Sequence, residues 1–328
     1  MNTELFNFIG LFVFLTGLCI GSFLNVVSLR AFTGESIVLP PSKCPKCGAK
    51  IMPWDNIPVL SYLILGGKCR NCKCHISLQY PVVEFITGAG FLFFYYTFAP
   101  LAFDTPFMWK KLLLFPFFAV IFALSVVIAI TDIKEKVVFD VHTISLLAII
   151  ILFKFTGGMF LDAIIGAVAG AAAMELLSGI GWIFARKRAF GTGDSYIAAS
   201  IGALLGVKMF VIALVTAVII QIACIIPFFI KKLISAKEYK LVTLFGVFTV
   251  MLILYKLPFI TEFNEIFQYV FIILLVIVGF YLCKLLLTLK SLKDNPTYWP
   301  FGPSLLLAMF LTALYGGVIK NFYLMLIY

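Results

Sequence analysis

Long apolar runs separated by short polar loops leave this chain few possible folds. A helix of roughly 17–25 apolar residues crosses a lipid bilayer, and about ten runs of suitable composition occur along the chain. They lie near residues 5–29, 81–100, 110–131, 139–155, 159–185, 194–206, 208–230, 240–258, 265–288 and 303–319. The run at 194–206 is short and is interpreted as a half-helix or one arm of a tight hairpin. We therefore predict an all-α polytopic membrane protein.

The composition supports a membrane protein. Hydrophobic residues make up 63% of the 328 residues and charged residues 12%, and the mean hydropathy is +1.12. A soluble domain does not need so much apolar side chain. The first run is long enough to span a bilayer, and Met1–Glu4 before it lacks the basic residues of a secretory signal. This run is therefore expected to stay as a transmembrane helix.

The positions of Lys and Arg predict the orientation in the membrane. The formal net charge is +10, and the basic residues gather in the loops after the first, third, fifth, seventh and ninth runs. Because cytoplasmic loops carry the excess of Lys and Arg, these loops are expected in the cytoplasm and the N-terminus outside. Basic residues confined to short loops are explained by this orientation. Membrane lipid is therefore an expected partner, and nucleic acid is not.

Four of the eight cysteines form two C-x-x-C pairs in the first of these loops. The pairs are Cys44 with Cys47 and Cys69 with Cys72, separated by residues 48–68. This spacing lets two turns converge on one tetrahedral ion, as in zinc ribbons. A cytoplasmic location disfavours disulfides. We predict a structural zinc site, because four thiolates leave no open position for water. Cys74 and His75, next to the second pair, are alternative ligands.

The loop at 31–80 is too small to hold a core by itself and is expected to be ordered by the ion. It returns to the membrane through the segment Leu78–Glu84, which places Glu84 in the first turn of the second run. Two interpretations of Glu84 have equal weight. It is either a partner of the helix dipole or a substrate-binding residue.

The segment Gly191–Asp194, with sequence Gly-Thr-Gly-Asp, opens the sixth apolar run. Ionisable groups at membrane depth are rare and usually mark a functional site. Glycines let a substrate strand approach the backbone closely, so Gly191 and Gly193 are predicted to bind substrate. The alternative is a helix cap, since Asp accepts hydrogen bonds from the first amides of a helix and glycines are common in turns.

A second carboxylate, Asp132, ends the third run on the same expected side of the membrane as Asp194. Two carboxyl groups that meet at helix ends cannot both ionise comfortably, so they share one proton. The ionised member can then take a proton from water while the protonated member polarises a peptide carbonyl, as in aspartic proteases. Asp132 and Asp194 are therefore the predicted catalytic pair. The alternative is that Asp132 is one more loop acid beside Lys134 and Lys136.

In this order the motifs form a familiar pattern. The chain resembles the bacterial type IV prepilin peptidases, which are prepilin leader peptidase/N-methyltransferases and belong to the G-x-G-D class of membrane aspartic proteases. The resemblance rests on Gly21–Val27, both cysteine pairs, Asp55–Pro58 with Ser61 and Tyr62, Tyr80–Glu84, Asp132, Gly191–Asp194 and Pro300–Pro303. It covers almost the whole chain except about 235–298.

The resemblance implies an enzyme of the bacterial inner membrane with its active site on the cytoplasmic side. It assigns catalysis to Asp132 and Asp194. It implies prepilins and pseudopilins as substrates, cut after the glycine that precedes their hydrophobic helix. Many members also methylate the new N-terminus with S-adenosylmethionine, and their cysteine loop is linked to that reaction. The resemblance therefore implies this cofactor, and no residue that binds it is assigned.

The chain departs from the family pattern in three places. Phe139 stands where the family usually has a proline before Asp140, and Tyr196 stands where a lysine is common. Residues 240–288 hold two apolar runs in place of a short loop, so two inserted helices are predicted beside a core of about eight. The expected organisation is a first helix at 1–30, a zinc loop at 31–80, a catalytic core at 81–234, the inserted pair at 235–298 and a last helix at 299–328.

Two other classes of function compete with the peptidase. The chain could be a catalytically inactive scaffold for pilus assembly, since it departs from the family pattern beside the catalytic positions. It could also be a proton-coupled transporter in which Asp132, Asp194 and Glu84 relay protons. No clear inverted repeat, which transporters often show, is visible in the sequence. A G-x-G-D protease for preflagellins is disfavoured, because such proteins typically lack the cysteine loop.

Overall fold

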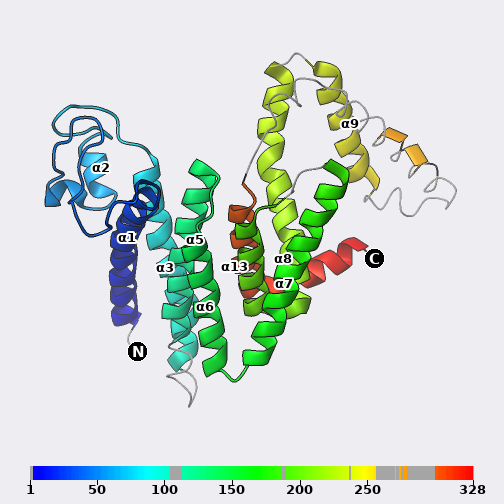
Figure 1. Ribbon diagram of the computed structural model, residues 1–328, viewed down its shortest axis with the longest axis horizontal. Coiled ribbons are helices and arrows are strands. Elements are labelled where there is room, and N and C mark those ends of the chain that lie inside the picture. Colours follow the sequence, from blue (N-terminus) through cyan, green and yellow to red (C-terminus); the bar gives the residue numbers. More distant parts are fainter. Residues whose placement is uncertain are drawn as a thin grey trace. The chain divides into compact units, whose positions relative to one another are not determined.

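The computed structural model of the chain is mainly helical in the parts that it describes (Figure 1). These parts are residues 3–103, 113–185, 190–235, 238–255, 270, 273–274, 277–278 and 300–327. Among them no strand is formed, and only two isolated bridges occur, both in the cysteine loop. The predicted all-α class is confirmed.

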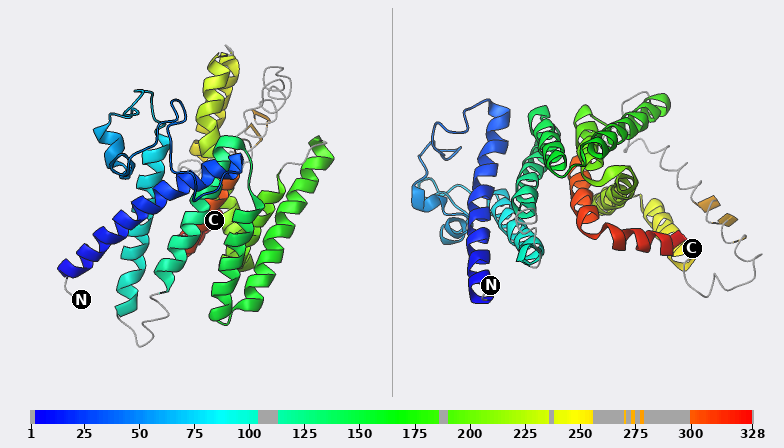
Figure 2. Two further views of the ribbon diagram at one scale, coloured as in Figure 1. Left: turned by 60° about the vertical axis from the view of Figure 1, so that its left-hand side comes forward. Right: turned by 90° about the horizontal axis from the view of Figure 1, so that it is seen from below.

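The chain forms two compact units. The first comprises Met1–Ala217 with Pro300–Tyr328, and the second comprises Val218–Trp299. The long helices of the first unit are α1 (Thr3–Thr33), α3 (Gln79–Phe103), α5 (Leu114–Glu135), α6 (Asp140–Thr156), α7 (Phe160–Ala185), the first part of α8 (Thr192–Ser235) and α13 (Gly302–Ile327). Helices α1, α3 and α5 contact one another, and α5 also contacts α6 and α13 (Figures 1 and 2).

Six of the described helices are long and apolar enough to cross a membrane. They are α1, α3, α5, α7, α8 and α13, which confirms a polytopic membrane protein. The predicted sixth and seventh runs, 194–206 and 208–230, join in the single element α8. This element is broken at Gly206, whose φ of 75° and ψ of 166° suit a residue without a Cβ. The boundary between the two predicted runs is therefore a kink within α8.

Aromatic side chains form much of the core between α3, α5 and α13. The ring of Phe94 lies 5.6 Å from that of Phe118 and 5.7 Å from that of Phe310. Offset and edge-on packing of such rings contributes about 0.5–1.5 kcal/mol per pair beyond the burial of area. This packing fixes α5 against the beginning of α13, and both of these helices contribute to the site described below.

Helices α7 and α8 approach each other closely at small residues. A Cβ added to Gly166 would lie 2.0 Å from the carbonyl oxygen of Gly202, and one added to Gly170 would lie 2.2 Å from that of Ala198. Only glycine fits at these positions, as is common where membrane helices pack. The contact fixes the first turns of α8, which carry Asp194.

The second unit contains the end of α8 and helix α9 (Tyr239–Tyr255). Leu233 and Leu241 are buried here and pack with Phe229, Val242, Leu244 and Phe245. Helix α9 covers most of the predicted run at 240–258. The predicted run at 265–288 lies almost entirely outside the described residues.

Candidate functional site

Asp132 lies in the last turn of α5. Its side chain is buried, with 4% of its surface exposed. The helix ends three residues later, at Glu135, where Lys136 adopts a left-handed conformation and donates its amide to the carbonyl oxygen of Asp132. One carboxyl oxygen, Oδ2, accepts a hydrogen bond of 3.1 Å from the backbone amide of Gly302 at the start of α13. The buried acid is therefore held by a segment 170 residues further along the chain.

Asp194 lies in the first turn of α8 and is half-buried. Its Oδ2 accepts a hydrogen bond of 3.2 Å from the backbone amide of Gly191, just before the helix. A carboxylate that reaches back to the residue before a helix satisfies an amide that would otherwise lack a partner. Asp194 is therefore not the N-cap that was the alternative to a functional role. It lies within the first turn of α8 and accepts the amide of the residue before the helix.

The fold brings the two predicted catalytic acids together. The charge on Asp194 acts on the carboxyl group of Asp132, so the two groups lie within electrostatic range. Both project from helix ends in the same compact unit. A neighbouring like charge raises the energy of double ionisation, so the pair favours a state in which one of the two groups is protonated. Such a pair can supply both an acid and a base.

The two glycines before Asp194 have different surroundings. A Cβ on Gly191 would meet nothing within 4 Å, whereas a Cβ on Gly193 would lie 2.5 Å from the Cβ of Val138. Because Gly193 has no side chain, the loop between α5 and α6 can pack against the start of α8. Gly191 faces open space. For both residues, binding of substrate stays a prediction.

Phe139 immediately precedes α6 and connects the site to α1. Its ring lies 5.0 Å from that of Phe32, and its neighbour Val138 packs on Gly193. A proline at position 139 would lack this ring. The departure from the family pattern at Phe139 therefore creates a contact between the end of α1 and the loop beside the two acids.

Glu84 lies near the start of α3 and is buried, with 7% of its surface exposed. Its Oε2 accepts a hydrogen bond of 2.7 Å from the backbone amide of Val59, and the Ser22 side chain also bonds it. Val59 has a φ of 60°, which is unusual for a β-branched residue. Glu84 thus anchors a strained turn of the cysteine loop to α1 and α3. Its predicted role in substrate binding stays a prediction.

The two cysteine pairs have the same local structure. The amide of Cys44 donates to the carbonyl of Ala49, and the amide of Cys69 donates to that of Cys74. The residue after each pair, Gly48 or Lys73, has a positive φ. The rest of the loop contains the short helices η1 (Pro53–Asn56) and α2 (Leu60–Ile64).

The four predicted ligand sulfur atoms form one cluster. Those of Cys44, Cys47, Cys69 and Cys72 lie within 4.8 Å of one another, and Cys44 Sγ is 3.8 Å from Cys72 Sγ. Tetrahedral zinc with bonds of about 2.3 Å requires sulfur atoms about 3.8 Å apart. The amides of Cys47 and Lys46 donate to the Cys44 sulfur and lower the pKa of that thiol to about 6. This favours the thiolate, which is the form that binds metal. The residues fit a zinc ion.

Cys74 is close to this cluster but differs from its members. Its sulfur lies 3.6 Å from that of Cys44. Its amide donates to the sulfur of Cys72, as the amide of Ala49 donates to the sulfur of Cys47. Cys74 therefore occupies the position equivalent to Ala49, which supplies an amide to a ligand. His75 pairs with Lys68 in a β-bridge, so it ends the second turn.

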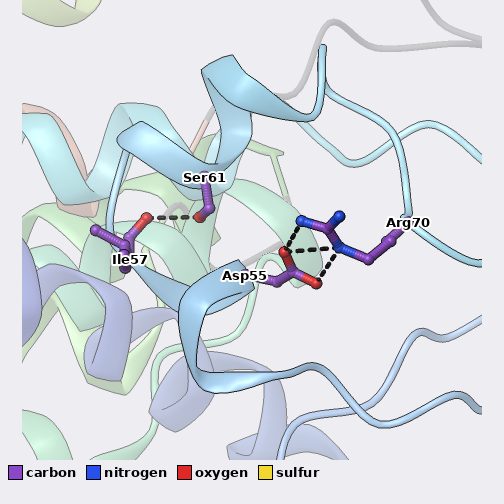
Figure 3. A network of polar contacts seen from close by, with 4 residues as sticks. All are labelled: Asp55, Ile57, Ser61 and Arg70. Carbon is purple, nitrogen blue, oxygen red and sulfur yellow. Dashed lines mark hydrogen bonds and ion pairs between the residues drawn. The ribbon is translucent and has the colours of Figure 1, made fainter.

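Asp55 and Arg70 connect the second cysteine pair to η1 (Figure 3). The guanidinium donates three hydrogen bonds of 3.0, 2.8 and 2.6 Å to the two carboxylate oxygens, and these bonds lower the pKa of Asp55. Ser61 Oγ donates to the carbonyl of Ile57 in the same network. Because the Arg70 side chain is 57% exposed, we expect the pair to add little to stability. Its geometry orients the turn.

Several residues of the site had no role from sequence alone. The carboxylate Glu175 on α7 accepts a hydrogen bond of 2.8 Å from Ser195 Oγ, next to Asp194. Phe190 and Phe301 pack with ring centroids 5.2 Å apart. Gly302 was part of the family pattern without a function. The available signal for Gly302 was a glycine between an aromatic residue and a proline at the start of an apolar run. That pattern does not identify Asp132 as its partner, because the contact depends on the tertiary fold.

Two protein families match the chain. The Bacterial Peptidase A24 N-terminal domain matches residues 15–98, and the Type IV leader peptidase family matches residues 118–226. The first match includes the cysteine loop and Glu84. The second includes Asp132 and Asp194.

Curated relatives are similar over the same region. A protein of Myxococcus xanthus is 38% identical over 207 residues, which are 61% of this chain and 58% of the relative. One of Neisseria gonorrhoeae is 31% identical, covering 63% of this chain and 80% of the relative. One of Klebsiella pneumoniae is 34% identical, covering 60% of this chain and 85% of the relative. Each is named prepilin leader peptidase/N-methyltransferase. No solved structure matches the chain.

Proposed function

Because this chain belongs to the type IV leader peptidase family, we propose that it is an aspartic endopeptidase that removes the leader from type IV prepilins and pseudopilins. The observation that carries the proposal is the pairing of Asp132 with Asp194. The two carboxyl groups lie within electrostatic range, and each accepts a backbone amide at Oδ2. The names of the relatives supply the substrate class.

The proposed reaction uses the shared proton of the pair. The ionised carboxyl group takes a proton from a water molecule, whose oxygen attacks the carbonyl carbon of the scissile bond. The protonated carboxyl group gives its proton to the carbonyl oxygen. When the tetrahedral intermediate collapses, the C–N bond breaks, a proton passes to the leaving nitrogen, and the pair again holds one proton. General acid–base catalysis of this kind contributes about 10²–10⁴-fold to a rate.

We place the reaction at the cytoplasmic face of the bacterial inner membrane. The apolar helices support a multi-pass membrane protein, and the loops rich in Lys and Arg support the orientation. A substrate helix lying in the bilayer then presents its N-terminal boundary to the acids. Its extended backbone must be sheltered by protein, since unpaired amides in hydrocarbon cost several kcal/mol. Gly191, which faces open space, is the proposed contact for that strand.

The cysteine cluster is proposed to hold a structural zinc ion. Cys44, Cys47, Cys69 and Cys72 would supply its four ligands. When bound, the ion holds the two turns together and takes no part in hydrolysis, because four thiolates fill its coordination shell.

We further propose methyl transfer to the new N-terminus from S-adenosylmethionine, in line with the relatives' names. A cavity of about 310 Å³ lies between α1 and the cysteine loop. This volume is in the range of small-molecule sites. Ser22, Arg30 and Asn56 supply polar groups to its lining, and Phe23 supplies an aromatic ring. These groups suit a charged nucleoside, so the cavity is the proposed site for the methyl donor.

A variant that fills this cavity should lose methyl transfer and keep prepilin cleavage. Val26→Trp, in its lining, should prevent binding of radiolabelled S-adenosylmethionine to the purified protein, and pilin from such cells should be cleaved but unmethylated by mass spectrometry. Leu29→Trp, on the exposed side of α1, is the matched control and should retain both. Normal binding by the Val26 variant would place the donor elsewhere.

Asn at either catalytic position tests the peptidase. Asp132→Asn and Asp194→Asn keep the shape of the side chain but cannot exchange the proton, so each should abolish prepilin cleavage while the purified protein stays folded. Processing is measured by the shift in mass of pilin in cells that carry the variant. Full processing by either variant, in cells that leave pilin unprocessed without this protein, would contradict the aspartic mechanism. Absence of processing by the wild type in the same cells would favour the scaffold or the transporter.

A further inference from the structure

The two proposed catalytic carboxyl groups are held in the same way. Each accepts a hydrogen bond at Oδ2 from the backbone amide of a glycine, Gly191 for Asp194 and Gly302 for Asp132. The bonds are 3.2 and 3.1 Å long. In both cases the glycine directly precedes or begins a helix, and in both cases a phenylalanine comes before it, Phe190 or Phe301. The chain thus contains two Phe-Gly pairs with equivalent contacts.

The two Phe-Gly pairs are also joined to each other. The rings of Phe190 and Phe301 pack with centroids 5.2 Å apart and planes inclined by 45°. Each amide therefore belongs to a segment that is fixed against the segment carrying the other amide. We refer to Phe190-Gly191 and Phe301-Gly302 as the Phe-Gly clamp.

The residue types around Gly302 suit this contact. A Cβ on Gly302 would lie 2.5 Å from Oδ2 of Asp132, so any larger residue forces the carboxyl group to move. Pro303 follows in the first turn of α13, where a residue without an amide is tolerated. Gly302 therefore supplies an amide at a point where the next residue cannot. A helix N-terminus also carries partial positive charge, which favours a nearby carboxylate.

We propose that the Phe-Gly clamp sets the separation and orientation of the Asp132 and Asp194 carboxyl groups, so that its four members are positioning residues for the peptidase. The proposal rests on the proposed function. Two carboxyl groups at short range repel each other when both are charged, and rotation about their side-chain bonds would separate them. An amide on each Oδ2 opposes that rotation and leaves Oδ1 of each group to meet water and substrate. The packed rings of Phe190 and Phe301 keep the two amides at a constant distance.

The first experiment displaces one carboxyl group. Gly302→Ala should lower kcat for prepilin cleavage by about 10²-fold, the loss typical of a misplaced catalytic group. KM should change by less than about twofold, because Gly302, unlike Gly191, has no proposed contact with the substrate. Gly317→Ala is the matched control on the same helix, since its Cβ would meet nothing within 4 Å. It should retain the wild-type kcat. A normal kcat in Gly302→Ala would overturn the proposal.

The second experiment tests whether the two pairs act as a unit. Phe190→Leu and Phe301→Leu each remove one ring of this contact, and their double variant completes a mutant cycle. If both rings act through one contact, kcat of the double variant should lie within about twofold of kcat of the less active single variant. Independent effects that multiply would contradict the clamp. This cycle decides the matter if Gly302→Ala fails to fold, as judged by its thermal unfolding.

Failure of the clamp and failure of the proposed function give different results. If wild-type protein does not cleave prepilin, the proposed function is wrong. If the wild type cleaves, Asp132→Asn does not, and Gly302→Ala equals the wild type, only the clamp is wrong.

Discussion

Backbone amides hold both groups of reactive side chains in this protein. Amides of Lys46 and Cys47 donate to the sulfur of Cys44, and amides of Gly191 and Gly302 donate to the two acids. Hydrogen bonds from amides to an ionised group stabilise its charged form and fix its direction. Each site therefore depends on two things: the identity of the ligand or acid, and the path of the backbone whose amides orient it.

The cysteine cluster allows a direct test at this scale. Cys44→Ser should lower the zinc content of the purified, reduced protein well below one equivalent, because three thiolates remain. Cys74→Ser should keep a full equivalent, since Cys74 contributes its amide to the site and serine preserves that amide. Zinc is measured by elemental analysis against protein concentration. Loss of zinc from the Cys74 variant would make its sulfur a ligand.

At the scale of helices, close approach of α7 and α8 determines where Asp194 lies. The contact between Gly166 and Gly202 leaves no room for a side chain on either helix. Lipid tails are as apolar as the side chains, so the hydrophobic effect does not drive helices together in a membrane. Close packing of this kind supplies the stability instead. The first turns of α8 are thus positioned by residues two turns deeper in the helix than the acid itself.

Adding one methyl group at this contact should therefore separate the helices. Gly166→Ala places a Cβ 2.0 Å from the Gly202 carbonyl oxygen and should destabilise the protein by about 1–3 kcal/mol. Cleavage of prepilin should fall with it. Gly179→Ala, on the same helix with nothing within 4 Å of the added atom, should behave as the wild type. Stability is measured by thermal unfolding in detergent, and cleavage by pilin processing in cells. Equal unfolding temperatures for Gly166→Ala and the wild type would show that α7 and α8 can move apart without loss of stability.

At the scale of the whole chain, the two acids lie in one compact unit and the segment predicted to be inserted lies in the other. Asp132, Asp194 and Gly302 lie in the first unit, and residues 218–299 form the second. The chain leaves the first unit within α8 and returns to it at Pro300. This arrangement favours a peptidase core that does not depend on the predicted helical pair at 235–298.

Removing that pair should preserve cleavage. We expect a variant in which a flexible linker replaces residues 236–298 to process prepilin at a rate within about tenfold of the wild type, because linker length affects closure only weakly. Asp194→Asn in the same shortened chain serves as the inactive control. If pilin stays unprocessed in cells where the shortened protein reaches the membrane, the second unit is needed for catalysis or substrate binding.

How much of this could be predicted from sequence differs between parts of the site. The pairing of Asp132 with Asp194 was predictable, because both lie at helix ends on one expected side of the membrane. The cysteine cluster was predictable from spacing alone. The contact of Phe190 with Phe301 and the amide from Gly302 were not, since they depend on how α13 packs against α5 and α8. The kink at Gly206 was indicated only by a glycine between two apolar runs.

The hydrogen bond from Gly302 to Asp132 has a consequence for synthesis of the protein. A ribosome that adds about 5–20 residues per second needs roughly 10–30 s to pass the 170 residues from one partner to the other. During that time Asp132 and, later, Asp194 are already in the membrane, but the amide that holds Asp132 has not been made. The growing chain therefore lacks this hydrogen bond until Gly302 is made, and only then can the arrangement of the two acids be completed.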